Sequence, residues 1–202
     1  MLCCPAANTD PQIDTAPDVD DRATQLICAW SHSEPGNPVT NSESIHATAL
    51  ASGRRGILLL GPSGSGKSDL ALRCLSLETA NGILHERFRL VADDRVIIKL
   101  RDRPAELVLS APDTIYGLIE VRGIGIIKLP DELVVSVNEV IALTVIITLS
   151  SQQLERSPVE QQTMIIQGQA VPHLTLRPFE TSAAQKIAIA LMRHTTSGNF
   201  NT

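Results

Sequence analysis

Short aliphatic runs separated by polar or glycine-containing turns fill most of the chain after residue 44. Continuous apolar runs of this length are typical of strands that are covered on both faces. We predict a turn at Gly53-Arg54-Arg55 and strands over Ile45–Ala51, Ile57–Leu60, Phe88–Ala92, Val96–Leu100, Leu107–Leu109, Ile124–Leu129 and Val140–Leu149. Near the C-terminus, turn residues around Gly168 predict a hairpin or paired strands made of Met164–Ile166 and Leu174–Leu176.

Helical spacing of apolar residues appears between these strands. A helix is predicted from about Lys67, with an apolar stripe of Leu70, Ala71, Cys74 and Leu75. Asp113 is a candidate cap for a short helix that runs through Glu120. A last helix is predicted to open with the capping-box pattern Ser182-Ala183-Ala184-Gln185 and to bury Ile187 and Leu191. The alternation of strands and helices indicates an α/β domain with a mixed β-sheet flanked by helices.

Charge and proline content set the first 44 residues apart. Seven acidic residues and one arginine give this segment a charge of −6, against −5 for the whole chain of 202 residues. Low hydrophobicity combined with net charge predicts a disordered tail, apart from a short apolar patch at Leu26–Trp30 that could dock. We therefore expect an acidic tail over residues 1–44, a catalytic domain over 45–193 and a C-terminal tail over 194–202.

The composition narrows the classes of function. An acidic chain with only five aromatic residues does not fit a nucleic-acid binder, which needs a basic surface or stacking platforms. The most apolar long stretch, Leu133–Leu149, is interrupted by Asn138 and Glu139, so we expect no membrane span. Its four cysteines show no metal-like spacing, and the chain opens with no signal peptide. These features predict a cytoplasmic protein with free thiols.

One motif points to phosphate binding. Residues 61–68 fit the pattern G-x-x-x-x-G-K-[ST] between a predicted strand and a predicted helix: Gly61, Pro62, Ser63, Gly64, Ser65, Gly66, Lys67 and Ser68. In such a loop the glycines let successive N–H groups face a phosphate, the lysine reaches the β- and γ-phosphates, and the final hydroxyl joins a Mg²⁺ ion. The motif predicts binding of a nucleoside triphosphate; the alternative is a tight glycine-rich turn without a ligand.

Acidic residues follow at two further places. Asp93 and Asp94 end a predicted strand, where P-loop proteins place a carboxylate near the metal. Because adjacent side chains of a strand point to opposite faces, one acid could face the metal and the other could act as a general base. Glu120 offers an oxygen ligand for Mg²⁺, and Arg122 offers a clamp for phosphate. In isolation, each of these would be an ordinary solvated residue.

Taken together, G-P-S-G-S-G-K-S, L-V-A-D-D-R-V and L-I-E-V-R-G-I-G-I-I resemble the catalytic domain of HPr kinase/phosphorylase, from about His46 to Arg193. The resemblance implies a P-loop fold related to phosphoenolpyruvate carboxykinase. It also implies ATP- and Mg²⁺-dependent phosphorylation of a serine on HPr, a phosphocarrier of the bacterial phosphotransferase system. Phosphorolysis of phospho-HPr and assembly into a homo-hexamer are further properties of that family.

The resemblance also implies roles for individual residues. The phosphate loop falls on residues 61–68 with Lys67 catalytic, and Asp94 matches the acid/base aspartate with Asp93 beside it. Ser68 and Glu120 match the metal ligands. His46 matches a histidine on the strand before the loop, and Arg156 is the nearest match to an active-site arginine.

Departures from the family pattern leave some properties open. Residues 1–44 do not resemble the family's additional N-terminal domain, so the chain is similar to the short form known from alphaproteobacteria. The family's R-P-G-R-N segment reads Arg177-Pro178-Phe179-Glu180-Thr181 here, and the loss of its second arginine leaves phosphorolysis in question. Two other classes of function remain as alternatives: a P-loop kinase for a small molecule, and a non-catalytic ATP-binding regulator.

Overall fold

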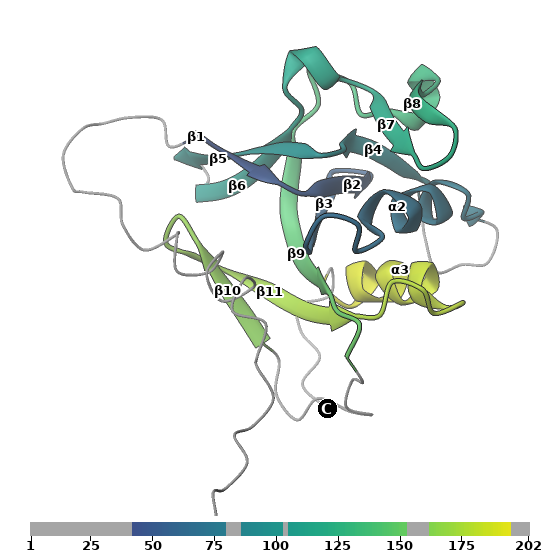
Figure 1. The fold of residues 1–202 in the computed structure, drawn as a ribbon. Helices are drawn as coiled ribbons and strands as arrows, with labels where there is room; N and C mark the ends of the chain where they lie inside the picture. Colours follow the sequence, from purple (N-terminus) through teal and green to yellow (C-terminus); the bar gives the residue numbers. More distant parts are fainter. Residues whose placement is uncertain (1–41, 80–85, 103–104, 153–161, 195–202) are drawn as a thin grey trace, which may run out of the picture. The chain divides into compact units, whose positions relative to one another are not determined.

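A computed structural model describes residues 42–79, 86–102, 105–152 and 162–194 (Figure 1). The described part contains a mixed sheet, a small two-stranded sheet and two α-helices, which confirms the α/β class. The strands of the large sheet are β1 (Ser42–His46), β2 (Thr48–Ser52), β3 (Arg55–Leu60), β4 (Phe88–Ala92), β5 (Arg95–Asp102), β6 (Ala105–Ser110), β9 (Ile141–Leu149), β10 (Gln162–Ile166) and β11 (Gln169–Leu176). The small sheet pairs β7 (Leu118–Val121) with β8 (Gly125–Lys128). The helices are α2 (Lys67–Leu75) and α3 (Ala183–Arg193).

The large sheet is mixed because β9 has parallel neighbours within an otherwise antiparallel arrangement. Its main path runs β1-β5-β6-β9-β3-β2-β4. Strands β3 and β11 pair with β9 in parallel, whereas β6 pairs with the start of β9 in the antiparallel sense. A hairpin around Gly168 is confirmed, since β10 and β11 pair antiparallel there, but its partners differ from those predicted: Met164–Ile166 pair with residues 169–171, and Leu174–Leu176 pair with β9.

Two pairs of consecutive strands make the sheet curl. Strand β1 leads into β2 through Ala47 alone, and β4 leads into β5 through Asp93 and Asp94. Strand β1 pairs with β5, and β2 pairs with β4, both in the antiparallel sense. The two composite strands, β1–β2 and β4–β5, therefore lie side by side and join the two ends of the sheet path. The single strand predicted over Ile45–Ala51 is therefore wrong: it breaks at Ala47, whose N–H donates to the Asp94 carbonyl. Strand β1 also begins at Ser42, three residues before the expected domain start.

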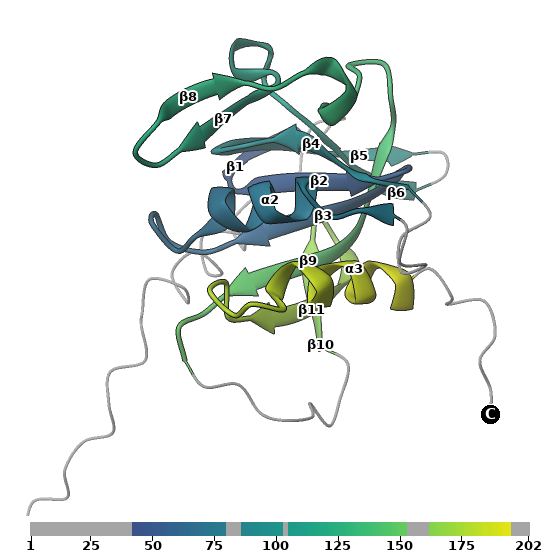
Figure 2. The ribbon, with the colours of Figure 1, turned by 90° about the vertical axis from the view of Figure 1, so that its right-hand side faces the viewer.

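Both helices pack on one face of the large sheet. Figure 2 shows α2 and α3 on the same side. Their apolar residues join alternate residues of β3 and β9 in one buried cluster, including Leu70, Leu75, Ile187 and Leu191 as predicted. The helices predicted to flank the mixed sheet are thus present, and within the described residues both lie on one face of it.

The opposite face is buried by the sheet itself. Leu58 of β3 and Ile146 of β9 point away from the helices, because neighbouring side chains of a strand alternate, and both are fully buried. The turn of the β10–β11 hairpin reaches the other side of the curl, where Gln167 Nε2 donates to the carbonyl oxygen of Ile98 on β5 at 3.3 Å. The curl of the sheet thus buries the face that the helices do not cover.

Two local predictions about helices need correction. The predicted helix over Asp113–Glu120 is only a 3-10 turn at Asp113–Ile115, because Gly117 turns the chain at φ +69° and Leu118–Val121 pairs with β8 instead. Helix α3 lies where predicted, but Ser182 makes no capping hydrogen bond with its side chain. Its backbone is already nearly helical (φ −89°, ψ 8°), whereas a capping serine needs an extended conformation. No helix within the described ranges is long and apolar enough to span a membrane.

Candidate functional site

The loop of residues 61–68 connects β3 to α2, in the strand–loop–helix setting that the motif requires. Gly64 and Gly66 have φ values of +77° and +92°, a region that side chains with a Cβ rarely occupy. Gly66 is also the residue that precedes helix α2. The first N–H groups of a helix have no acceptor within the helix, so those that follow Gly66 are available to an anion.

Lys67 folds back over this loop and is 6% exposed. Its Nζ donates to the carbonyl oxygens of Gly61 (2.9 Å) and Pro62 (3.0 Å) and lies 3.1 Å from His46 Nε2. Burial lowers the pKa of Lys67, while the charges of Asp93 and Asp94 act in the opposite direction. The structure therefore holds a cationic side chain on the inside of the loop.

His46 links Lys67 to Asp94. Its Nδ1 lies 3.0 Å from both the carbonyl oxygen and the Oδ1 carboxylate oxygen of Asp94. Because these oxygens can only accept, Nδ1 carries the proton and Nε2 accepts from the Lys67 ammonium. The result is a continuous chain of contacts from the loop lysine, through the imidazole, to a carboxylate.

Asp93 and Asp94 lie in opposite surroundings at the turn between β4 and β5. Asp93 is 4% exposed; its Oδ1 accepts from Thr48 Oγ1 (2.6 Å) and Ser68 Oγ (2.9 Å), and its Oδ2 accepts from the Glu120 N–H (3.1 Å). The Asp94 side chain is 69% exposed, on a backbone with φ +69°. Asp93 therefore ties the loop to β2 and β7, and Asp94 presents its carboxylate to solvent.

Three further residues were proposed for the site from the sequence: Glu120, Arg122 and Arg156. Glu120 is exposed on β7 and joins the group through its backbone N–H. Arg122, in the turn after β7, brings its Nη2 to 3.6 Å from where a Cβ on Gly64 would lie. Arg156 lies outside the described residues.

Three residues of this region were given no role in the site by the analysis of the sequence. Thr48 donates to Asp93, and the only local signal was a single hydroxyl in a buried strand. Phe179 lies against Gly66, where a Cβ would come within 3.0 Å of the ring. Arg73 of α2 donates through Nη1 to the Glu180 carbonyl oxygen at 3.2 Å and through Nη2 to the Pro178 carbonyl oxygen. No sequence signal connects Arg73 to a loop more than 100 positions away.

The donor set suits a hard cation that keeps other ligands. The Ser68 hydroxyl and the Asp93 carboxylate are 2.9 Å apart, which brings together oxygen donors of the type that Mg²⁺ prefers. Within the described ranges no three His, Cys, Asp or Glu side chains form a group that could hold a metal. Mg²⁺ commonly binds through one or two carboxylates together with substrate phosphates and waters. The residues present fit a Mg²⁺ ion of that kind.

Comparisons with known proteins find similarity to HPr kinases. Residues 37–198 match the family described as HPr Serine kinase C-terminal domain. The chain is 35% identical over 126 residues to an HPr kinase/phosphorylase of Bacillus licheniformis, an alignment that covers 60% of this chain and 37% of the relative. It is 33% identical over 138 residues to an HPr kinase/phosphorylase of Lactobacillus delbrueckii, covering 66% of this chain and 40% of the relative.

A solved structure extends the similarity to the fold. The structure of the Hpr(Ser) kinase/phosphatase from Coxiella burnetii superimposes with a TM-score of 0.59 at 26% sequence identity. The alignment covers 76% of this chain and 96% of that chain. By contrast, the chain spans only about two fifths of the length of the Bacillus and Lactobacillus relatives.

Proposed function

The chain belongs to the HPr serine kinase C-terminal domain family, and from this membership we propose that it is an ATP- and Mg²⁺-dependent kinase that phosphorylates a serine of an HPr-like phosphocarrier protein. We include in the proposal a P-loop fold related to phosphoenolpyruvate carboxykinase and a cytoplasmic location. The observation that carries it is the line of contacts from Lys67 through His46 to Asp94, beside the glycine-rich loop.

The loop supplies the positive side of the site. Phosphoryl transfer depends mainly on positioning and on neutralising the charge of the phosphates. The Lys67 ammonium lies inside the loop, and the free N–H groups at the start of α2 add partial positive charge. Arg122, beside Gly64, adds a guanidinium that can form paired hydrogen bonds with phosphate oxygens. These groups bind and orient the β- and γ-phosphates of ATP.

Ser68 and Glu120 are the residues that we propose to hold Mg²⁺, with Asp93 next to them. When bound, the ion would offset the negative charge that the phosphate oxygens carry. Asp93 already accepts hydrogen bonds from the Ser68 hydroxyl and from the Glu120 N–H, so one buried carboxylate positions the Ser68 hydroxyl and the backbone of Glu120. Asp93 is therefore a positioning residue for this part of the site.

Asp94 is the proposed general base. Its exposed carboxylate can take the proton from the serine hydroxyl of the acceptor. The serine oxygen then forms a bond to the γ-phosphorus, the bond to the bridging oxygen breaks, and ADP leaves. His46 holds the Asp94 carboxylate in place through Nδ1 and orients Lys67 through Nε2. We propose that Arg156, which matches the family's arginine, also acts in catalysis.

Replacement of Asp94 by asparagine tests this assignment. We expect Asp94→Asn to keep ATP affinity within about 2-fold and to lower the rate of transfer to HPr by ~10²-fold or more, as is typical when a general base is lost. Asparagine tolerates the left-handed backbone of residue 94, so the fold should be retained. Transfer is measured with purified HPr and Mg·ATP, using mass spectrometry to detect phosphoserine.

Asp131→Asn is the matched control, because Asp131 is also an exposed aspartate but lies in a separate 3-10 turn. It should transfer phosphate at the wild-type rate. Wild-type transfer by Asp94→Asn would exclude Asp94 as the base. If the wild-type protein transfers phosphate from γ-labelled ATP to a small metabolite and not to HPr, the result would instead favour a metabolite kinase. If the wild-type protein shows no turnover of ATP, a nucleotide-binding regulator would be favoured.

A further inference from the structure

A large aromatic side chain lies exposed beside the phosphate loop. Phe179, in the segment between β11 and α3, is 73% exposed. Its ring approaches Gly66 so closely that a Cβ at that position would lie 3.0 Å from Cζ. Gly66 immediately precedes Lys67, so the ring adjoins the loop at the end that leads into α2.

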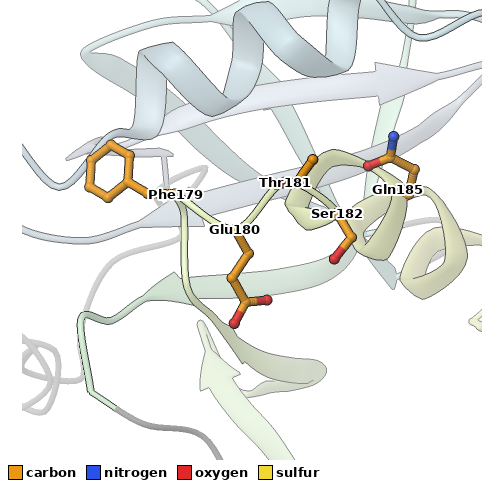
Figure 3. A pocket seen from close by; sticks show the side chains of 5 residues that line it. All are labelled: Phe179, Glu180, Thr181, Ser182 and Gln185. Atoms are coloured by element: carbon orange, nitrogen blue, oxygen red, sulfur yellow. The ribbon is translucent and has the colours of Figure 1, made fainter.

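A shallow hollow of about 560 Å³ adjoins the ring (Figure 3). Its lining consists of Phe179, Glu180, Thr181, Ser182 and Gln185, which come from the loop before α3 and the first turns of that helix. The lining thus includes an aromatic side chain, two hydroxyls, an amide and a carboxylate, with the Phe179 ring at one end of the segment. This combination suits a flat heterocycle, since an aromatic ring stacks on its face while hydroxyl and amide groups hydrogen-bond to its edge.

The one charged side chain in the lining of the hollow is compensated by its neighbours. Glu180 is the one charged residue in the lining, and it is anionic. Its contact with Lys186 lowers the pKa of the Glu180 carboxyl, so the carboxylate stays ionised at neutral pH. This carboxylate is paired with Lys186, and its Oε1 lies 4.0 Å from Arg177 Nε, so a neutral ring meets no uncompensated charge in the hollow.

Arg73 holds this segment in a defined position. Its guanidinium donates to the carbonyl oxygens of Pro178 and Glu180 on either side of Phe179, and its Nη2 lies 3.0 Å from Asp69 Oδ2 on the same helix. The backbone that carries the aromatic ring is thereby anchored to α2, the helix that begins at the phosphate loop. A platform fixed in this way can receive a ligand with little loss of conformational entropy.

We propose that Phe179 is a stacking platform for the base of the nucleotide whose phosphates occupy residues 61–68. Thr181, Ser182 and Gln185 line the edge of this base site and hydrogen-bond to the heterocycle. The inference rests on the proposed function, because it requires a nucleotide in the loop. It assigns the ring-binding part of that ligand to the β11–α3 segment.

The test compares ATP with a ligand that lacks a base. Dissociation constants for Mg·ATP and for magnesium tripolyphosphate are measured by calorimetry on the full chain. We expect Phe179→Ala to weaken ATP binding by about 5-fold or more and to leave tripolyphosphate affinity within about 2-fold, since stacking is lost and the phosphate contacts are retained. Phe179→Tyr should retain the affinity for ATP, because it keeps the stacking surface.

Ile165→Ala is the control for loss of an exposed apolar side chain, since Ile165 is 60% exposed but lies on β10. It should change neither constant. Unchanged ATP affinity in Phe179→Ala, or an equal loss for both ligands, would overturn the base site while leaving phosphate binding intact. If the wild-type chain binds neither ligand, the proposed kinase function fails as well, and the base site fails with it.

Discussion

Adjacent residues can have unrelated tasks, as Asp93 and Asp94 show. Strand alternation predicted that two neighbouring acids would face different partners. The structure buries Asp93 under three donors and leaves Asp94 exposed in a left-handed turn. The pairing of the two acids was visible in the sequence, but which one is buried depends on Thr48 and Glu120, which lie 45 and 27 positions away.

Removal of the Asp93 carboxylate should destabilise the protein. Asp93→Ala leaves the hydroxyls of Thr48 and Ser68 and the Glu120 N–H without their acceptor, and we expect the free energy of unfolding to fall by about 2–4 kcal/mol. Urea unfolding followed by circular dichroism measures the change. The neighbouring Asp94→Asn serves as the control and should stay within about 0.5 kcal/mol of the wild type. Equal stability of Asp93→Ala and the wild type would contradict the structural role of this carboxylate.

At the scale of elements, local pattern predicted most strands and missed the places where the chain changes direction. The aliphatic runs of β3, β4, β5, β6 and β9 and the stripe of α2 all fall where periodicity indicated. The errors at Ala47, Gly117 and Ser182 lie at boundaries. There the conformation depends on a partner strand or on a backbone turn, neither of which hydrophobic spacing reports.

The turn of the β10–β11 hairpin offers a test at this scale. Gln167 and Gly168 both have positive φ, at +45° and +77°. A Cβ at Gly168 would meet nothing within 4 Å, so Gly168→Ala changes the backbone energy alone. We expect a loss of about 1 kcal/mol in unfolding free energy, the usual cost of a left-handed conformation for alanine.

Gly168→Asn is the matched variant, because asparagine tolerates the left-handed region better than alanine does. It should lose less stability than Gly168→Ala in the same thermal or urea unfolding experiment. If the two variants lose the same amount, the positive φ is not the cause of the change.

For the domain as a whole, the main structural fact is that the large sheet curls and buries the face that lies opposite the two helices. Both helices lie on one side, and the composite strands β1–β2 and β4–β5 close the curl. The candidate site lies at the break in these composite strands, where His46 and Ala47 meet Asp94. A change in the sheet should therefore affect the site and the stability together.

Burial of His173 should make this stability depend on pH. Its Nε2 lies 2.9 Å from Thr148 Oγ1 between two parallel strands, and burial lowers the pKa of His173 below the ordinary value of 6.5. The unfolded state therefore takes up a proton more readily than the folded state. Stability should fall as the pH drops through about 6.5 toward the lowered pKa, and it should be retained above 6.5.

The measurement is urea unfolding at pH 7.5 and at pH 5.5 for the wild type and for His173→Gln. The difference between the two pH values should be smaller in the variant. Part of the dependence should remain, because burial and Arg193 also lower the pKa of His194. An identical dependence in both proteins would show that His173 does not contribute.

The local pattern of apolar, polar and glycine residues was enough to identify most strands, the α2 stripe and the glycine-rich loop. Hydrophobic periodicity and the need for positive φ both depend on residues only a few positions apart. The same pattern also placed Lys67, Ser68, Asp93 and Asp94 in or beside the loop, while His46 emerged only through resemblance to a family. The contact of His46 with Asp94 joins residues 48 positions apart, and that of Arg73 with Pro178 joins residues 105 apart. Such contacts follow from which strand edges pair and which face the helices cover. These choices minimise the free energy of the whole sheet, so no local pattern reports them.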